Sequence, residues 1–361
     1  MLLKLNYILW LGIIAFLIGL VIYPYYIKAL SFLKIRKSLR EDDATWQKSE
    51  IFNKLHGHKA GTPTMWWWVF LIIMLIMIVL SLIAKQLWYT NYDFTNFKET
   101  WLLMFGFFSM GCIWLVDDIF NVLKIWKVRW LSAKAKLAWM FLFSWFISYW
   151  FYVRLWVDTV NLRPIDSSFY MWIFTPIFFF VTTIAIVNAI NITDGLDGLA
   201  WGLMTIIFLV LAVVAFMSWK FLTAAMLLIM IASLISFLWY NISPAKIFMW
   251  DSWAFAMWGL LSVTVYLLNT KLNIEWEQME IWIILPFCIL FGIFILELWS
   301  SFLQIVRKKR KKKKLFAIAP FHHLLEHKWL KEHTIVMKFW LIQAVLSLIT
   351  LILIFYQIHS I

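Results

Sequence analysis

Long apolar runs recur along the whole chain, and they restrict its possible folds more than any other feature. Ten runs of about 20 residues alternate with polar loops, and 64% of the 361 residues are hydrophobic. A helix of about 20 apolar residues spans a bilayer, so the pattern predicts an all-α polytopic membrane protein with about ten transmembrane helices. The predicted spans are 7–30, 65–88, 101–119, 137–156, 170–189, 199–217, 220–239, 252–269, 281–303 and 335–357.

Positive charge is concentrated in three of the predicted loops. The formal net charge is +13. Short loops rich in Lys and Arg stay in the cytoplasm, so these three loops should share that side of the membrane. With ten spans, both termini then lie outside the cytoplasm. The basic loops are 31–61, 124–136 and 307–314, whereas the loops at 89–100, 157–169 and 270–280 are mixed or acidic.

The run RKKRKKKK at 307–314 has a second interpretation, as a nucleic-acid signal. Its position beside a predicted spanning helix instead favours anionic lipid or a role in topology, so we expect no nucleic-acid partner. No linker rich in Pro, Gly or Ser divides the chain, and no repeat of about 20–50 residues is present. Residues 1–361 are therefore predicted to form one integral membrane domain.

Polar and ionisable side chains collect at the predicted cytoplasmic ends of the spans. Ionisable residues near membrane depth are unfavourable and indicate function by default. Because distant segments place them on the same membrane face, we expect one shared site. These residues are Lys59, Thr62 and Thr64 before the second span, Asp117 and Asp118 at the end of the third, Asn188, Asn191, Asp194 and Asp197 at the junction of the fifth and sixth, Asp251 at the eighth, and His322, His323, Glu326 and His327 in the last loop.

The acidic residues favour a hard metal ion. The adjacent carboxylates of Asp117 and Asp118 repel each other unless a cation, a hydrogen bond or a proton intervenes. Several carboxylates without a cysteine cluster suit Mg²⁺, which typically binds through one or two carboxylates and phosphate oxygens. The sequence therefore predicts Mg²⁺ as a cofactor.

The segment NAINITDGLDGLA, residues 188–200, has features of a phosphate site. Asn188 and Asn191 are three residues apart, as are Asp194 and Asp197, so each pair would share one face of a helical turn. The glycines allow the backbone to approach a phosphate closely. Nearby histidine, lysine and threonine side chains can bond phosphate oxygens. Together these features predict metal-assisted phosphoryl transfer at the membrane surface.

Each cluster also has an ordinary interpretation. An aspartate pair at a helix end is often a solvated cap, and Asn, Asp and Gly together favour simple turns. One cluster can easily be ordinary, but it is much less probable that all of them are ordinary and lie on the same membrane face. A transporter or flippase is an alternative, but it predicts charges near the bilayer midplane and often inverted repeats. A non-catalytic membrane scaffold is a further alternative.

At these residues the chain resembles the polyprenyl-phosphate N-acetylhexosamine-1-phosphate transferase superfamily, over nearly its whole length. The segment at 188–200 is the most specific for the superfamily. The elements GTPTM and P-x-HH favour its muramoyl-pentapeptide branch over N-acetylglucosaminyl relatives, although Leu324 stands where the branch has a third histidine. The resembling segments are AGTPTM at 60–65, VDD at 116–118, NAINITDGLDGLA at 188–200, FLWYNISPAKIFMWD at 237–251, APFHH at 319–323 and KFW at 338–340.

The resemblance implies an activity and a partner set. Undecaprenyl phosphate would attack the β-phosphorus of UDP-N-acetylmuramoyl-pentapeptide (UDP-MurNAc-pentapeptide), giving lipid I and UMP for peptidoglycan synthesis. It also implies ten helices, a bacterial plasma (inner) membrane location, a cytoplasmic active site and a homodimer. A transferase for another UDP-N-acetylhexosamine is the alternative within the superfamily.

The resemblance further implies roles for individual residues. The catalytic residues would be Asp117 and Asp118 at the lipid phosphate, Asp251, His322 and His323; the substrate-binding residues Lys59, Thr64, Asn188, Asn191, Asp194, Asp197 and Phe248; and the metal ligands Asp251 and Asp194.

Tryptophan stands at many positions where the superfamily has glycine. Only 11 of 361 residues are glycine, roughly 3% against an average near 7%. Aromatic belts at the membrane interface do not explain indoles inside catalytic loops. Adaptive replacement would need many changes from glycine to tryptophan, each adding a side chain of roughly 150–250 Å². We hypothesise a decoding artefact, in which UGA codons for glycine are translated as tryptophan, and expect Trp250 and Trp253 to crowd Asp251. The positions are Trp66, Trp67, Trp114, Trp130, Trp201, Trp250, Trp253, Trp258 and Trp329.

Overall fold

The computed structural model describes most of the chain, and it is mainly helical. The described residues are 2–33, 59, 61–65, 68–86, 101–112, 133–155, 159–162, 167–170, 175–249, 251–269, 272–274, 277–279, 284–328 and 330–359. The helices are α1 (Leu2–Phe32), α3 (Trp68–Gln86), α5 (Ala133–Leu155), α6 (Thr175–Thr193), α7 (Leu199–Met217), α8 (Phe221–Asn241), α9 (Asp251–Asn269), α10 (Ile284–Leu290), α11 (Gly292–Lys311), α12 (Phe321–His327) and α13 (Glu332–His359), with a further helix over Trp101–Cys112.

A helix occurs at each of the ten predicted apolar runs. The predicted span 199–217 coincides with α7, and most others differ by a few residues at their ends. Among the described residues, five helices are long and apolar enough to cross a membrane: α1, most of α3, α7, α8 and most of α13. The structure thus contains several membrane spans, whereas ten crossings and the orientation of the termini stay predictions.

The predicted span 281–303 differs most from the observed helices. It is divided into α10 and α11, with Phe291 between them, and α11 continues through the first five residues of the basic run, 307–311. Lys and Arg are good helix formers, and cations near a helix C-terminus interact favourably with the helix dipole. This explains why the basic run extends the helix instead of beginning a loop.

Three short pairs of strands accompany the helices. Two are antiparallel hairpins in loops that the charge pattern predicts outside the cytoplasm: β2 (Thr159–Leu162) with β3 (Ser167–Tyr170), and β5 (Leu272–Ile274) with β6 (Glu277–Met279). The third pairs β1 (Thr64–Met65) with β4 (Phe248–Met249) in parallel. This third pair joins two segments that the sequence links to function.

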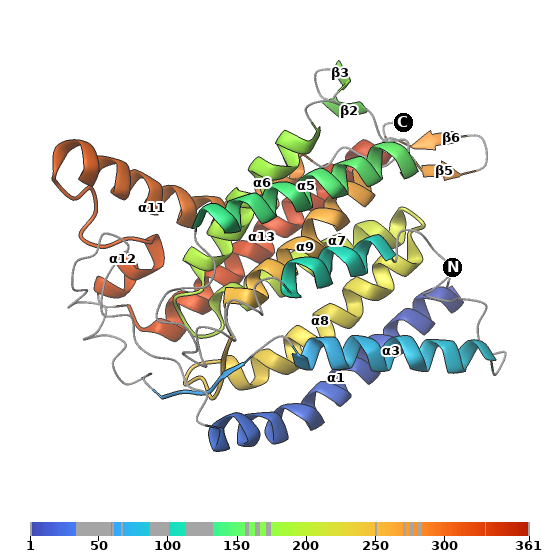
Figure 1. Ribbon diagram of the computed structural model, residues 1–361, viewed down its shortest axis with the longest axis horizontal. Helices are drawn as coiled ribbons and strands as arrows, with labels where there is room; N and C mark the ends of the chain where they lie inside the picture. The colour runs from blue at the N-terminus through green and yellow to red at the C-terminus, as the bar shows by residue number, and fades with distance from the viewer. Residues whose placement is uncertain are drawn as a thin grey trace.

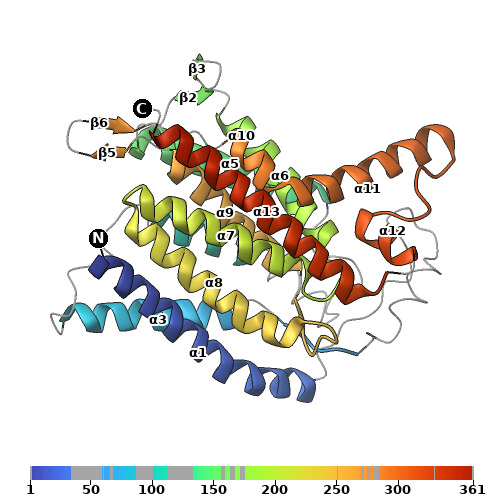
Figure 2. The ribbon, with the colours of Figure 1, turned by 180° about the vertical axis from the view of Figure 1, so that it is seen from behind.

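The helices pack side by side with α7 and α8 at the centre. Helix α1 packs on α8, α8 on α7, and α7 on α13 (Figure 1). Of the five apolar spans, α7 and α8 are the most buried. Both views place the two chain ends at the end of the bundle opposite α12 (Figure 2). Consequently α12 and the first residues of α13 lie together at the other end.

Two of the tryptophans that the resemblance implies at glycine positions lie in the helical core. Trp201 and Trp258 are fully buried, and the Trp258 ring meets the Phe143 ring edge to face at 5.3 Å. Among the described residues, no acceptor reaches the Trp258 indole N–H, and a buried unsatisfied donor costs about 1–3 kcal/mol. The predicted crowding of Asp251 stays a prediction. Trp250 lies outside the described residues, and the Trp253 side chain is not described.

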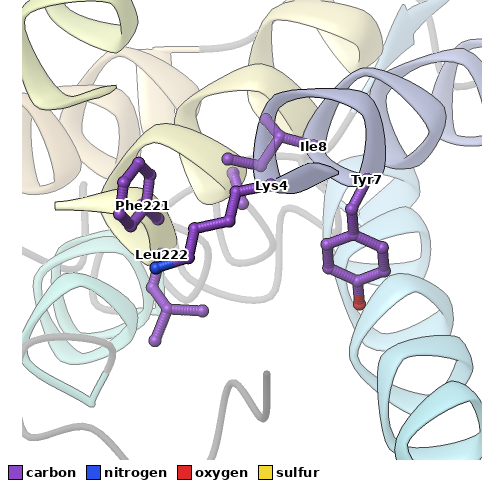
Figure 3. Close-up of a pocket in the computed structure, with 6 residues that line it drawn as sticks. Lys4, Tyr7, Ile8, Phe221 and Leu222 are labelled. Carbon is purple, nitrogen blue, oxygen red and sulfur yellow. The ribbon is translucent and has the colours of Figure 1, made fainter. Parts of the chain in front are cut away.

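A small pocket near the N-terminus is remote from the segments linked to function. Its lining includes Lys4 and Tyr7 of α1 and Phe221 and Leu222 of α8 (Figure 3). Its volume is about 10 Å³, close to the minimum that holds one water molecule. The Lys4 Nζ atom lies over the Phe221 ring, 4.3 Å from its centroid. This pocket is too small for a substrate.

Candidate functional site

The parallel pairing of β1 with β4 brings two predicted segments together. Thr64 is in register with Phe248, and the Phe248 backbone N–H donates to the carbonyl oxygen of Pro63 at 2.9 Å. Asp251 follows β4 as the first residue of α9. The GTPTM segment therefore lies directly beside the segment that leads to Asp251, whose side chain is outside the described part.

Lys59 forms ion pairs with two carboxylates from distant parts of the chain. Its ammonium donates to Asp197 Oδ1 at 2.7 Å and to Glu332 Oε1 at 2.5 Å. The exposed fractions of the Lys59, Asp197 and Glu332 side chains are 11%, 4% and 13%. We call these three residues the Lys59 cluster. Because they are largely shielded from water, their pairing is needed to compensate the lost hydration of each charge.

Asp197 bonds protein groups through both of its carboxylate oxygens. Its Oδ2 accepts a hydrogen bond from the Ala245 backbone N–H at 3.0 Å, and its own backbone N–H donates to Glu332 Oε1 at 2.6 Å. Both carboxylate oxygens thus have partners within the protein. Asp197 therefore connects Lys59 to the segment that precedes β4.

The turn after Asp197 is fixed by a glycine and an asparagine. Gly198 has φ of 76°, a left-handed conformation that glycine adopts without strain. Its backbone N–H donates to Asn241 Oδ1 at 3.0 Å, and Asn241 Nδ2 donates to the Ile247 carbonyl at 2.8 Å. Asn241 therefore connects the α6–α7 turn to the chain entering β4.

His322 is buried at the start of α12 and is held by Glu297 of α11. Its Nδ1 lies 3.1 Å from Glu297 Oε2, and its backbone N–H donates to Glu297 Oε1 at 3.1 Å. Both side chains have no exposed surface. His323 pairs with Glu326 at 3.1 Å. The two carboxylates thus set the orientation of both imidazoles.

The histidine pair lies against the α6–α7 turn. A Cβ atom on Gly195 would collide with Nε2 of His322 and would lie 3.1 Å from Nε2 of His323. Gly195 directly follows Asp194. The turn that carries the predicted metal ligand is therefore in contact with the predicted phosphate-binding histidines.

Two buried polar atoms in this region have no partner among the described residues. They are Thr64 Oγ1 and His322 Nε2. A buried polar group without a hydrogen bond is unfavourable and requires an explanation. Both atoms belong to segments that the sequence links to function.

The two asparagines of 188–200 lie in a helix, whereas the two aspartates lie in the turn that follows it. Asn188 and Asn191 lie in α6, where Asn188 is exposed and its Nδ2 donates to the Ile184 carbonyl at 2.7 Å. Helix α6 ends at Thr193, so Asp194 and Asp197 lie in the turn that follows. The expectation that these two aspartates share a helix face is wrong, because the glycines at 195 and 198 allow the chain to turn there.

The structure leaves part of the predicted metal site untested. Asp117 and Asp118 lie outside the described residues. Within the described part, no group of three or more His, Cys, Asp or Glu side chains is arranged to hold a metal ion. Asp194 and Asp251 stay predicted ligands, and their carboxylates are the type of group that Mg²⁺ prefers.

Three residues of the site were not among the predicted ones. Glu297 is an ionisable residue within the predicted span 281–303, a signal that should have indicated function. Glu332 precedes the last predicted span by a few residues, and Asn241 ends α8. Asn241 lies in the resembling segment 237–251, but the roles of both residues depend on contacts with residues far away in the chain.

Comparison with known proteins identifies the class first. Residues 100–270 match glycosyl transferase family 4. Among curated relatives, phospho-N-acetylmuramoyl-pentapeptide-transferase of Staphylococcus carnosus is 30% identical, covering 94% of this chain and 97% of that protein. The enzymes of that name from Dictyoglomus turgidum (95% and 97% covered) and Chlamydia muridarum (91% and 93%) are each 32% identical. The chain belongs to the phospho-N-acetylmuramoyl-pentapeptide-transferase family.

Proposed function

We propose that this multi-pass bacterial membrane protein transfers phospho-N-acetylmuramoyl-pentapeptide from UDP-MurNAc-pentapeptide to undecaprenyl phosphate. The products are lipid I and UMP, and the reaction serves peptidoglycan synthesis. Family membership supports the reaction. The observation that carries it to this chain is the meeting of the Lys59, Asp197 and His322 segments at one end of the bundle, with Thr64 Oγ1 and His322 Nε2 lacking partners among the described residues.

The reaction exchanges one phosphorus–oxygen bond for another. An oxygen of the lipid phosphate attacks the β-phosphorus of the donor, and the bond from that phosphorus to the bridging oxygen breaks, releasing UMP. The lipid phosphate is largely ionised at neutral pH, so little of the barrier depends on removing a proton. The catalytic contribution is positioning and stabilisation of charge on the phosphoryl oxygens.

The described residues divide these tasks between them. The Lys59 ammonium has three N–H donors. Two point to Asp197 and Glu332, which leaves one donor for the nucleotide. Thr64 Oγ1 and His322 Nε2 bond donor oxygens, with His323 next to them. Phe248, Asn188, Asn191 and Asp194 line the nucleotide pocket, and Asp117 and Asp118 orient the lipid phosphate.

Mg²⁺ is the proposed cofactor, held by Asp251 and Asp194. When bound, it neutralises charge on the pyrophosphate. A calorimetric titration with Mg²⁺ tests these ligands without turnover: Asp251→Asn and Asp194→Asn should weaken metal binding, whereas Asp197→Asn should affect it less because its oxygens bond Lys59 and Ala245.

The proposed location is the bacterial plasma (inner) membrane. The site faces the cytoplasm, both termini lie outside it, and the protein forms a homodimer. The basic end of α11 lies toward the same end of the molecule as α12 (Figure 1), in agreement with the positive-inside rule.

Donor specificity tests the proposed function. The full chain is purified in detergent and supplied with Mg²⁺, undecaprenyl phosphate and either UDP-MurNAc-pentapeptide or UDP-N-acetylglucosamine. UMP release with the first donor and none with the second is the expected result. Release only with the second donor would favour the alternative branch, and no release with either would favour a scaffold.

A further inference from the structure

Glu332 occupies a position that neither the motifs nor the proposed reaction explains. It is the first residue of α13, and its Oε1 accepts hydrogen bonds from the Lys59 ammonium at 2.5 Å and from the Asp197 backbone N–H at 2.6 Å. One carboxylate oxygen therefore contacts two segments that the proposed function assigns to the nucleotide. Among the described residues of the Lys59 cluster, Glu332 alone bonds both the Lys59 side chain and the α6–α7 backbone through a single oxygen atom.

The position of Glu332 is fixed by helix packing. Trp340, two turns further along α13, lies against Gly202 of α7, where a Cβ atom would collide with the indole. Asp197 directly precedes the glycine that caps α7. Contact between α7 and α13 thus brings Glu332 and Asp197 together.

Charge explains why this contact affects Lys59. The cluster contains one cation and two carboxylates, so the ammonium is drawn to a point between them and its side chain is restricted. Without the Glu332 charge, Lys59 pairs with Asp197 alone and gains rotamer freedom. A flexible lysine loses more entropy when a ligand binds, so nucleotide binding should weaken.

We propose that Glu332 is a positioning residue that holds Lys59 and the Asp197 turn in the geometry that accepts the uridine nucleotide. This role rests on the proposed function, because it assigns the cluster to the donor side of the transferase site. It predicts an effect on the donor and not on the lipid acceptor.

The test compares Glu332→Gln with a control on the same helix, Gln343→Leu. Gln343 is buried and its Nε2 donates to the Leu290 carbonyl at 2.8 Å, so its loss loosens α13 without touching the cluster. Calorimetry gives the Kd for UMP, and turnover gives kcat and the KM for each substrate. Glu332→Gln should weaken UMP binding and raise the donor KM about tenfold, the effect of replacing a charge-assisted hydrogen bond with a neutral one, while kcat and the acceptor KM stay near wild type.

The possible results distinguish a positioning role of Glu332 from a general loss of stability, and also from failure of the proposed function. Unchanged UMP affinity in Glu332→Gln would overturn the positioning role. So would a pattern of KM shifts, for donor and acceptor alike, that matches the one measured for Gln343→Leu. A wild-type protein that binds UMP without turning over would refute the proposed function, and the UMP affinities would still decide the role of Glu332. If Glu332→Gln fails to fold, Glu332→Asp, which keeps the charge on a shorter side chain, replaces it in the same comparison.

Discussion

Gly195 and His322 approach so closely that no side chain larger than hydrogen fits at residue 195. A Cβ atom there would collide with Nε2 of His322, and His322 cannot retreat because Glu297 holds both its ring and its backbone. The contact joins the α6–α7 turn to α12, two parts of the chain more than a hundred residues apart.

Gly195→Ala should therefore reduce turnover sharply. Displacing either the turn or the imidazole moves groups proposed to bond the donor, and an error of about 1 Å in such a site can lower the rate about a hundredfold. The measurement is kcat/KM for UMP release. The matched control is Gly292→Ala in α11, where the added Cβ would lie 3.2 Å from a Leu346 methyl group and should have little effect. Equal activity of the two variants would contradict the assignment of the contact.

Removing Lys59 should destabilise the protein more than removing Glu332. In Lys59→Met the carboxylates of Asp197 and Glu332 remain buried without their cation, and breaking a buried pair in this way costs about 3–5 kcal/mol. In Glu332→Gln the Lys59–Asp197 pair persists.

A double variant checks this charge argument. Adding Glu332→Gln to Lys59→Met removes one of the two repelling carboxylates, so thermal unfolding in detergent should occur at a higher temperature than in Lys59→Met alone. Additive losses of stability in the double variant would show that the two charges do not interact.

Glu297→Ala should lower both stability and turnover. It leaves the His322 ring and backbone N–H without their acceptors, at about 1–3 kcal/mol for each unsatisfied group. Glu297→Gln retains an acceptor oxygen and should lose less. The thermal unfolding midpoint and kcat are compared with those of Glu326→Gln, which alters the His323 pair at the same N–O distance of 3.1 Å. Wild-type stability and turnover in Glu297→Ala would rule out a role in holding His322.

The tryptophans at family glycine positions lead to a prediction about the gene. We expect UGA codons at Trp66, Trp67, Trp250, Trp253 and Trp258, and glycine at these positions in the protein made by the source organism. Sequencing the codons and peptide mass spectrometry of the native protein check this. UGG at all five codons would refute the decoding hypothesis. The version with glycine should also turn over faster, because we expect Trp250 and Trp253 to crowd Asp251.

The fold was largely predictable, because apolar runs of helical length leave few alternatives in a membrane. The break at Phe291 was not, because nothing in the hydrophobic pattern marks it. The grouping of Lys59, Asp197 and His322 followed from the span pattern and loop charge, which predict all three at cytoplasmic helix ends. The contacts of Glu297 and Glu332 could not be predicted, because each joins residues far apart in the chain, although the position of Glu297 within a predicted span indicates function. The prediction that Asp194 and Asp197 share a helical turn was wrong, because α6 ends at Thr193 and the glycines at 195 and 198 allow the chain to turn there.

The fate of the two donor phosphates tests the proposed reaction most directly. UDP-MurNAc-pentapeptide labelled separately at the α- and β-phosphate is incubated with the purified full chain, Mg²⁺ and undecaprenyl phosphate, and the lipid and aqueous phases are counted. The β-label should enter the lipid product and the α-label should leave in UMP. Both labels in the aqueous phase as UDP, with the sugar on the lipid, would contradict attack at the β-phosphorus.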